Sequence, residues 1–122
     1  MITCYKMTTF ANPKVWGSSA WVFLHCISRT FPETPNIQDR NNYILFFRSL
    51  AEVLPCKLCR NHYREWLQLY PIEKYVANRD SLKNWVFLMH NYVNLRQRKK
   101  LIKDCDSGDI IILNHAKKNK IF

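Results

Sequence analysis

A chain of 122 residues has the length of one domain, large enough for a modest core but not for two domains. Apolar residues make up 48% and aromatic residues 14%, which excludes a disordered chain, and only two glycines occur, which argues against glycine-rich phosphate loops and hairpin-rich β folds. The net charge of +10 is spread through every segment, so it indicates a solvated surface rather than a specific nucleic-acid site.

No segment contains the roughly 20 apolar residues that a membrane-spanning helix requires. The first residues, MITCYKMTTFANPK, lack the apolar stretch of a secretory signal, so we expect a protein of the cell interior. The five cysteines are odd in number and irregularly spaced, which does not fit a secreted disulfide framework. Two closely spaced cysteines in such a chain more often form a redox-active pair or bind a metal.

Two long helices are predicted in the first half of the chain. The first begins after Asn12 as its N-cap, with Pro13 at the first helical position, and ends near residue 31, where two prolines in FPETPN stop it. Asn36 caps the second helix, 37–54. Its apolar residues are predicted to form one stripe, which comprises Ile37, Ile44, Phe47, Leu50 and Val53 or Leu54.

Two further helices are predicted in the second half. The third covers 56–70 and stops at Pro71, and the fourth covers 82–100, capped by Asp80 or Ser81. The segment DIIIL (109–113) fits a strand or a fifth short helix, and the helix is favoured because a lone strand has no partner. We expect an all-α bundle as domain 12–116, between a flexible tail at 1–11 and a basic tail at 117–122.

The pair Cys56 and Cys59 lies at the start of the third predicted helix, directly after Pro55. Residues three apart share one helical face with Cα atoms about 5–6 Å apart, which is within disulfide range. The unpaired N–H groups of a first helical turn, together with Lys57 and Arg60, favour a thiolate there. This environment indicates a redox-active cysteine pair.

Zinc binding is an alternative interpretation of the same segment. Cys56, Cys59 and His62 could supply three ligands, with Cys105 or His90 as the fourth. The redox interpretation is favoured because a second ligand pair is missing and CxxCxxH on one helix gives poor tetrahedral geometry. A third alternative is that both cysteines are merely buried thiols. No βαβ pattern surrounds the pair, so a thioredoxin-like module is not expected.

Aromatic and polar residues also gather on the first and fourth helices. Gly17 shares one face with Trp21 and His25, and glycine inside a helix costs roughly 1 kcal/mol relative to alanine, which suggests that another group approaches the backbone. The fourth helix carries an imidazole, amides and cations, with Val93 beside them. The polar residues are His90, Asn91, Asn94, Arg96, Lys99 and Lys100. Singly, each has an ordinary structural explanation, but together they fit an adenine dinucleotide held between helices.

Three motifs occur in order, W-x3-H, P-C-x2-C and H-N-x-V-N. With them the chain resembles the Erv/ALR family of FAD-linked sulfhydryl oxidases from Pro13 to Cys105, and it is most similar to the short members encoded by large DNA viruses. The resemblance implies a four-helix bundle with a short fifth helix that cradles FAD, usually as a homodimer. It also implies that the protein is located in the host cytoplasm or the virion, and less so in the mitochondrial intermembrane space.

The resemblance assigns roles to the residues already singled out. Cys56 would meet the substrate and Cys59 would face the flavin. The residues implied to bind FAD are Gly17, Trp21, His25, Cys59, His90, Asn91, Val93, Asn94, Arg96, Lys99 and Lys100.

The implied reaction forms disulfides in thiol-containing proteins, among which a thioredoxin-like carrier is one candidate. Electrons would pass from the Cys56–Cys59 pair through FAD to O₂, which becomes hydrogen peroxide. The alternative function is a non-enzymatic basic helical binding module with a structural Cys/His zinc site. No metal, specific nucleic acid or membrane span is expected for the oxidase.

The chain also departs from the family pattern. Many cellular members carry a second, structural disulfide, but Leu82 stands near the position of one of its cysteines, so we expect Cys105 not to form that bond. The tryptophan found near the C-terminus of many members is absent. Cys4 could be a shuttle or interchain thiol, although a bystander role is preferred, and Cys26 is interpreted as a core thiol.

Overall fold

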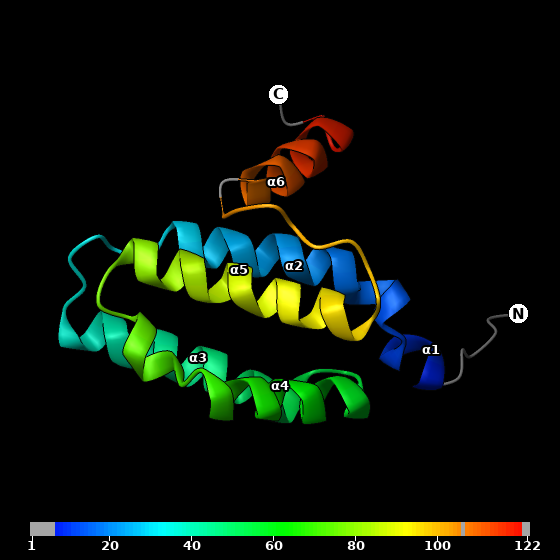
Figure 1. The fold of residues 1–122 in the computed structure, drawn as a ribbon, viewed down its shortest axis with the longest axis horizontal. Helices are drawn as coiled ribbons and strands as arrows, with labels where there is room; N and C mark the ends of the chain where they lie inside the picture. The colour runs from blue at the N-terminus through cyan, green and yellow to red at the C-terminus, as the bar shows by residue number, and fades with distance from the viewer. Residues whose placement is uncertain (1–6, 106, 121–122) are drawn as a thin grey trace, which may run out of the picture.

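The computed structural model describes residues 7–105 and 107–120, whose regular structure is entirely helical, as predicted. Figure 1 shows the helices in chain order: α1 (Met7–Ala11), α2 (Pro13–Arg29), α3 (Ile37–Val53), α4 (Lys57–Leu69), the 3-10 turn η1 (Ile72–Tyr75), α5 (Arg79–Arg96) and α6 (Ser107–Lys118). Within the described residues, none of these helices combines the length and apolar character needed to cross a bilayer.

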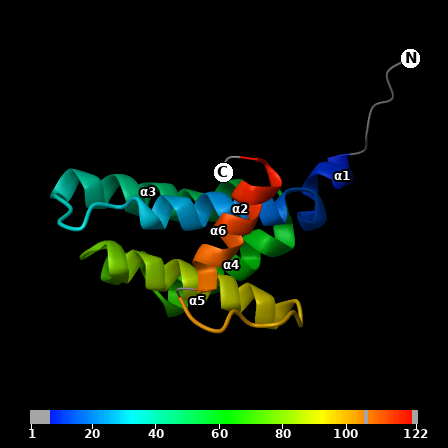
Figure 2. The same cartoon turned by 90° about the horizontal axis from the view of Figure 1, so that it is seen from above.

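The four long helices form the predicted bundle as two layered pairs. Helix α2 packs beside α5, and α3 packs beside α4 in the layer below (Figure 1). The fifth helix, α6, packs on α2 and crosses the α2–α5 layer on the side away from α4 (Figures 1 and 2). Segments distant in sequence therefore meet at the α2–α5 contact.

Asparagine side chains begin α2 and α3, as predicted. The Asn12 carboxamide oxygen accepts the N–H of Lys14 at 3.0 Å, and Pro13 takes the first helical position. At the start of α3, the Asn36 side chain accepts the Asp39 N–H at 2.8 Å while the Asp39 carboxylate accepts the Asn36 N–H at 3.0 Å. This reciprocal capping box satisfies two donors that the helix itself leaves unpaired.

The predicted bounds of the fourth helix were wrong at both ends. Asn78 is the N-cap of α5, because its side chain accepts the Ser81 N–H at 2.9 Å, whereas the prediction named Asp80 or Ser81. The helix ends at Arg96 rather than at residue 100. Arg98 adopts a left-handed backbone with φ of 55°, and a right-handed helix cannot continue through that conformation.

The two predicted tails contain helical structure. Helix α1 occupies positions 7–11 of the segment expected to be flexible, and α6 is longer than the predicted helix 109–113 and reaches residue 118. The choice of helix over strand for 109–113 is confirmed. Cys4 lies outside the described residues, and the domain bounds of 12 and 116 stay a prediction.

Buried aromatic rings fill the space between the layers. Trp85 of α5 is fully buried, with its ring centroid 5.2 Å from Phe47 of α3 and 5.9 Å from Trp66 of α4. Its indole N–H donates to the Tyr70 carbonyl at 2.8 Å, so the polar atom of this ring is paired. One side chain thus joins three helices.

The predicted apolar stripe of α3 was wrong at Ile37, and of the two alternatives for its last position it is Leu54, not Val53, that packs against the core. Phe47 is fully buried, but the exposed fractions of Ile37 and Val53 are 68% and 66%. Six residues at about 100° each place Val53 roughly 240° around the helix from Phe47, so it faces away from the core. Ala51, one turn beyond Phe47, takes the buried position instead.

Replacing Asn36 by alanine should lower the free energy of unfolding by about 1 kcal/mol, because the capping box loses its side-chain acceptor. Chemical denaturation followed by circular dichroism measures this change. The control Asn41→Ala alters an exposed asparagine inside the same helix and should not lower the free energy of unfolding, because alanine favours the helix. Equal effects of the two substitutions would contradict the capping argument.

Candidate functional site

A cavity of about 900 Å³ lies between α2, α4 and α5. The end of α3 contributes Leu50 and Leu54 to its wall, and α6 contributes Ile111. The volume falls in the range of roughly 300–1,000 Å³ that is typical of small-molecule and cofactor sites. The wall combines apolar and aromatic side chains with a few polar groups, which is also typical of such sites.

Most of the predicted cofactor residues line this cavity. They are Gly17, Trp21, Cys59, His90, Val93, Asn94, Arg96 and Lys99. The fold brings these residues together from α2, α4 and α5 and from the turn after α5. Arg96 also contacts Glu65 and donates to the Tyr92 hydroxyl at 2.8 Å, so its guanidinium is already engaged by the protein.

Three predicted cofactor residues are not in the cavity wall. His25 is fully buried behind His90, with its Nε2 2.9 Å from Nδ1 of that ring. The Asn91 side chain holds the segment after α5, since it accepts the Ile102 N–H at 2.7 Å and donates to the Ile102 carbonyl at 2.9 Å. Lys100 is exposed and lies outside the wall. Their direct contact with a cofactor stays a prediction, and His25 and Asn91 support the wall from behind.

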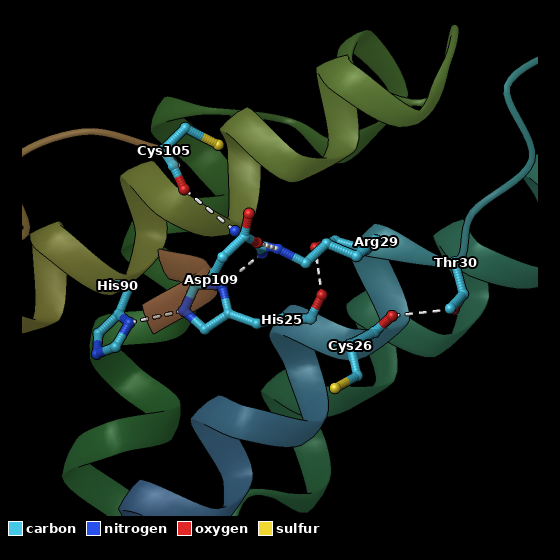
Figure 3. A network of polar contacts seen from close by, with 8 residues as sticks. His25, Cys26, Arg29, Thr30, His90, Cys105 and Asp109 are labelled. Atoms are coloured by element: carbon cyan, nitrogen blue, oxygen red, sulfur yellow. Dashed lines mark hydrogen bonds and ion pairs between the residues drawn. The ribbon is translucent and has the colours of Figure 1, made fainter. Parts of the chain in front are cut away.

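Stacked rings join the two sides of the α2–α5 contact. The Trp21 and His90 rings are nearly parallel, with centroids 3.8 Å apart and an angle of 9° between planes. Both residues line the cavity, whereas His25 lies beyond them (Figure 3 shows the His25–His90 contact). The stack gives the wall a flat aromatic portion in a fixed orientation.

The two central histidines are held in the neutral state. Burial lowers the pKa of His25 to about 4, with a further contribution from the Arg29 cation. Burial likewise lowers the pKa of His90 to about 3, with smaller contributions from His25 and Lys99. At neutral pH the pair is therefore uncharged, and each ring has one donor and one acceptor nitrogen.

The cysteine pair lies where α4 begins. Cys56 is the N-cap rather than a residue of the first turn, and its Sγ accepts the Cys59 N–H at 3.2 Å. Both side chains are thiols and half-buried. An N–H donor at a helix start stabilises negative charge on the accepting sulfur, so this geometry suits thiol–disulfide chemistry.

The two thiols differ in their surroundings. Cys59 lines the cavity, and Cys56 does not. Burial and the adjacent Cys56 sulfur raise the pKa of Cys59 to about 12, so at neutral pH this thiol keeps its proton in the reduced pair. The thiolate expected at this helix start therefore does not reside on Cys59 in the reduced pair.

Several wall residues escaped the sequence analysis. Tyr63 and Trp66 lie about one and two helical turns after Cys59 on the same face of α4, so helical spacing alone could have found them. His62, which the sequence suggested as a possible zinc ligand, also lines the cavity. Ile111 had no sequence signal, because nothing in DIIIL indicates where α6 docks.

Among residues 7–105 and 107–120, no three histidine, cysteine, aspartate or glutamate side chains lie close enough together to hold a metal ion. The zinc alternative named Cys56, Cys59 and His62 as its first three ligands. In the described part of the chain, these side chains do not form a ligand cluster.

A family model described as the Erv1 / Alr family matches residues 18–116, which include the cysteine pair and most of the cavity-lining residues. The chain belongs to this family. The resemblance found in the three sequence motifs is thereby confirmed.

Two viral relatives illustrate the match to the Erv1/Alr family. A probable FAD-linked sulfhydryl oxidase of Acanthamoeba polyphaga mimivirus is 35% identical over 92 residues, which cover 75% of this chain and 64% of that protein. The chain therefore spans somewhat less than two thirds of that relative. A FAD-linked sulfhydryl oxidase of African swine fever virus is 33% identical over 87 residues, which cover 71% of each protein.

Solved Erv1 structures have the same fold. The yeast Erv1 core superimposes with a TM-score of 0.74 at 24% identity and covers 80% of each chain. The FAD binding domain of Erv1 from Saccharomyces cerevisiae gives a TM-score of 0.72 at 25% identity, covering 79% of this chain and 89% of that domain. The helical bundle is therefore the family fold.

Acidification should destabilise the protein through His25 and His90. In the unfolded chain both histidines take up protons near pH 6.5, whereas in the folded chain they stay neutral until about pH 4 and 3. Stability that is present above pH 6.5 is therefore lost as the pH falls, by about 1 kcal/mol per histidine between pH 6.5 and 5.5. Urea unfolding at several pH values measures the decline.

Two variants isolate this contribution. His90→Gln should reduce the decline to about half, since one of the two buried neutral histidines is gone. His115→Gln removes a histidine outside the His25–His90 pair and should retain the full decline. The explanation would be wrong if His90→Gln and the unmodified protein lost stability in parallel.

Proposed function

We propose that this Erv1/Alr family member is a FAD-linked thiol oxidase that forms disulfide bonds in substrate proteins. The observation that carries the proposal is the position of Cys59. This thiol belongs to a CxxC pair at a helix start, and it lines a cavity of cofactor size. The names of the viral relatives, FAD-linked sulfhydryl oxidases, support the same function.

Features of the cavity support FAD as its occupant. A methyl group added at Gly17 would meet only Pro13 within the protein, at an ordinary 3.8 Å, so protein packing does not require glycine there. A ligand against the backbone does explain it. The Trp66 indole N–H is buried with no acceptor in the described part of the protein, and Trp66 lines the cavity. A cofactor rich in acceptor atoms would meet this need.

The residues proposed to hold the cofactor divide by chemistry. Trp21 and His90 offer ring faces and edges, and Asn94 offers an amide. Lys99 supplies a cation for the pyrophosphate. When bound, FAD accepts two electrons from a thiol pair and can return them to O₂, which becomes hydrogen peroxide.

The protein's own chemistry is thiol–disulfide exchange at the oxidised cysteine pair. A substrate thiolate attacks Cys56, the sulfur outside the cavity, so a mixed disulfide forms as the Cys56–Cys59 bond breaks. The raised pKa of Cys59 means that its released sulfur takes up a proton. The second substrate thiolate then attacks the substrate sulfur of the mixed disulfide and displaces Cys56. The substrate has lost two electrons and two protons, which the cysteine pair has gained.

The partners are thiol-containing proteins, for which a thioredoxin-like carrier is one candidate, and O₂. A homodimer is part of the proposal, and exposed apolar side chains on α2 and α3 support it, since Phe23 is 60% and Leu45 68% exposed.

The host cytoplasm or the virion is the proposed cellular location, and the viral relatives support it. A mitochondrial relative from Schizosaccharomyces pombe is also 34% identical.

Purification tests the cofactor directly. The protein should be yellow, and denaturation should release FAD identified by its absorbance and chromatographic retention. A colourless protein with stoichiometric zinc would refute the oxidase and restore the binding-module alternative.

Cysteine substitutions should separate the roles of the pair. Cys59→Ser should lower the rate of dithiothreitol oxidation at least about 100-fold and retain flavin, because the redox-active disulfide can no longer form while the cavity remains. Cys56→Ser should lower the rate of oxidation of a protein substrate by a similar factor, because the substrate thiolate attacks Cys56. Oxygen uptake and flavin absorbance measure both effects. Cys105→Ser is the matched control and should stay active, and full activity of Cys59→Ser would disprove its role.

Substitutions at Gly17 should separate folding from cofactor binding. Gly17→Ala should raise the free energy of unfolding of the flavin-free protein by about 0.5–1 kcal/mol, because alanine favours the helix. Gly17→Leu should lower flavin content, because its side chain would occupy cavity space. Thermal unfolding and bound-flavin absorbance give the two readouts. Ser19→Leu, an exposed site on the same helix outside the wall, is the control, and unchanged flavin in Gly17→Leu would contradict the fit.

A further inference from the structure

The Arg29 guanidinium lies at the junction of three segments (Figure 3). Its Nε donates to the Asp109 carboxylate of α6, and its Nη2 donates to the Cys105 carbonyl at 3.1 Å. Its Nη1 lies 3.2 Å from Nδ1 of His25, one turn earlier on α2. The Arg29 side chain is only 14% exposed, and these contacts use three of its five N–H donors.

The contact between Arg29 and His25 determines which nitrogen of the imidazole carries the proton. A guanidinium can only donate, so Nδ1 of His25 must accept. A neutral imidazole has one N–H, and that hydrogen must then be on Nε2 of His25. This Nε2 lies 2.9 Å from Nδ1 of His90 and donates to it.

The same reasoning extends to the cavity wall. Since Nδ1 of His90 accepts from His25, the hydrogen of neutral His90 is on Nε2. His90 lines the cavity, and Nε2 is the ring nitrogen that His25 does not use. An N–H on this nitrogen suits an acceptor atom of a ligand in the cavity, such as an adenine nitrogen or a phosphate oxygen.

We infer that Arg29 is a positioning residue: it fixes the tautomers of His25 and His90 so that His90 offers an N–H donor to the cofactor. This inference rests on the proposed function for the identity of the cofactor, but the tautomers themselves do not depend on it. Asp109 and the Cys105 carbonyl keep the guanidinium directed at His25, so the docking of α6 contributes to the arrangement. Arg29 itself is not in the cavity wall.

Nitrogen-15 NMR of the protein as purified tests the tautomers. Two-bond proton–nitrogen correlations distinguish a protonated from an unprotonated ring nitrogen in each of the four histidines. His62→Gln and His115→Gln identify the signals of the other two rings. At pH 7.5, His25 and His90 should both be protonated at Nε2 and unprotonated at Nδ1. A hydrogen on Nδ1 of either ring would overturn the inference, whether or not the protein contains flavin.

Substitutions of Arg29 test its role. Arg29→Met removes every donor and should leave His25 and His90 as tautomer mixtures, with FAD bound about fivefold to tenfold more weakly through the lost donor. Arg29→Lys keeps a group that can only donate, so it should preserve the tautomers. Arg48→Met removes another interhelical arginine–carboxylate pair, the one with Glu73 at 2.7 Å, and should change neither the tautomers nor FAD affinity.

The outcomes separate positioning from general structural support. Unchanged tautomers in Arg29→Met would overturn the inference. An equal loss of FAD affinity in Arg29→Met and Arg29→Lys would overturn it as well. A normal tautomer pattern in a protein that contains no flavin would refute the proposed cofactor while leaving the assignment to Arg29 intact.

Discussion

The hydrogen bond between His25 and His90 joins the two helices on which the cavity depends. It crosses from α2 to α5, and the Trp21 ring stacks on His90 beside it. The bond requires at least one neutral ring as the acceptor, because two protonated imidazoles would face each other with donors only. Burial meets that requirement by lowering both pKa values. The flat aromatic wall, the position of α5 and the polarity of the His90 edge all follow from this contact.

The cysteine pair depends on a different constraint, the end of a helix. Pro55 cannot continue α3, and Cys56 then caps α4 with its sulfur. Cys59 lies in the first turn, where packing against the other helices buries it at the cavity. One thiol therefore lies outside the cavity wall while its neighbour is part of that wall. The pair differs in environment although it shares one helical face.

Local sequence was a good guide where one residue decides the structure, and a poor guide where several compete. The caps at Asn12 and Asn36 were predicted because each stands alone before an apolar helix. Before α5, three suitable capping residues lie within four positions, and only the folded backbone selects Asn78. Seven residues at about 100° each bring Leu54 back to the face of Phe47, so periodicity favours Leu54 over Val53 as the last member of the apolar stripe.

The sequence by itself determined the four long helices, the CxxC pair at a helix start and the ordered motifs of the family, because capping, proline and residue spacing act within a few positions. Only the tertiary structure decided that His25 lies behind His90, that Asn91 holds the backbone of Ile102, and that Ile111 closes part of the cavity. Helical spacing specifies which residues share a face. It does not specify which other helix that face meets, since that choice depends on packing between segments far apart in the chain.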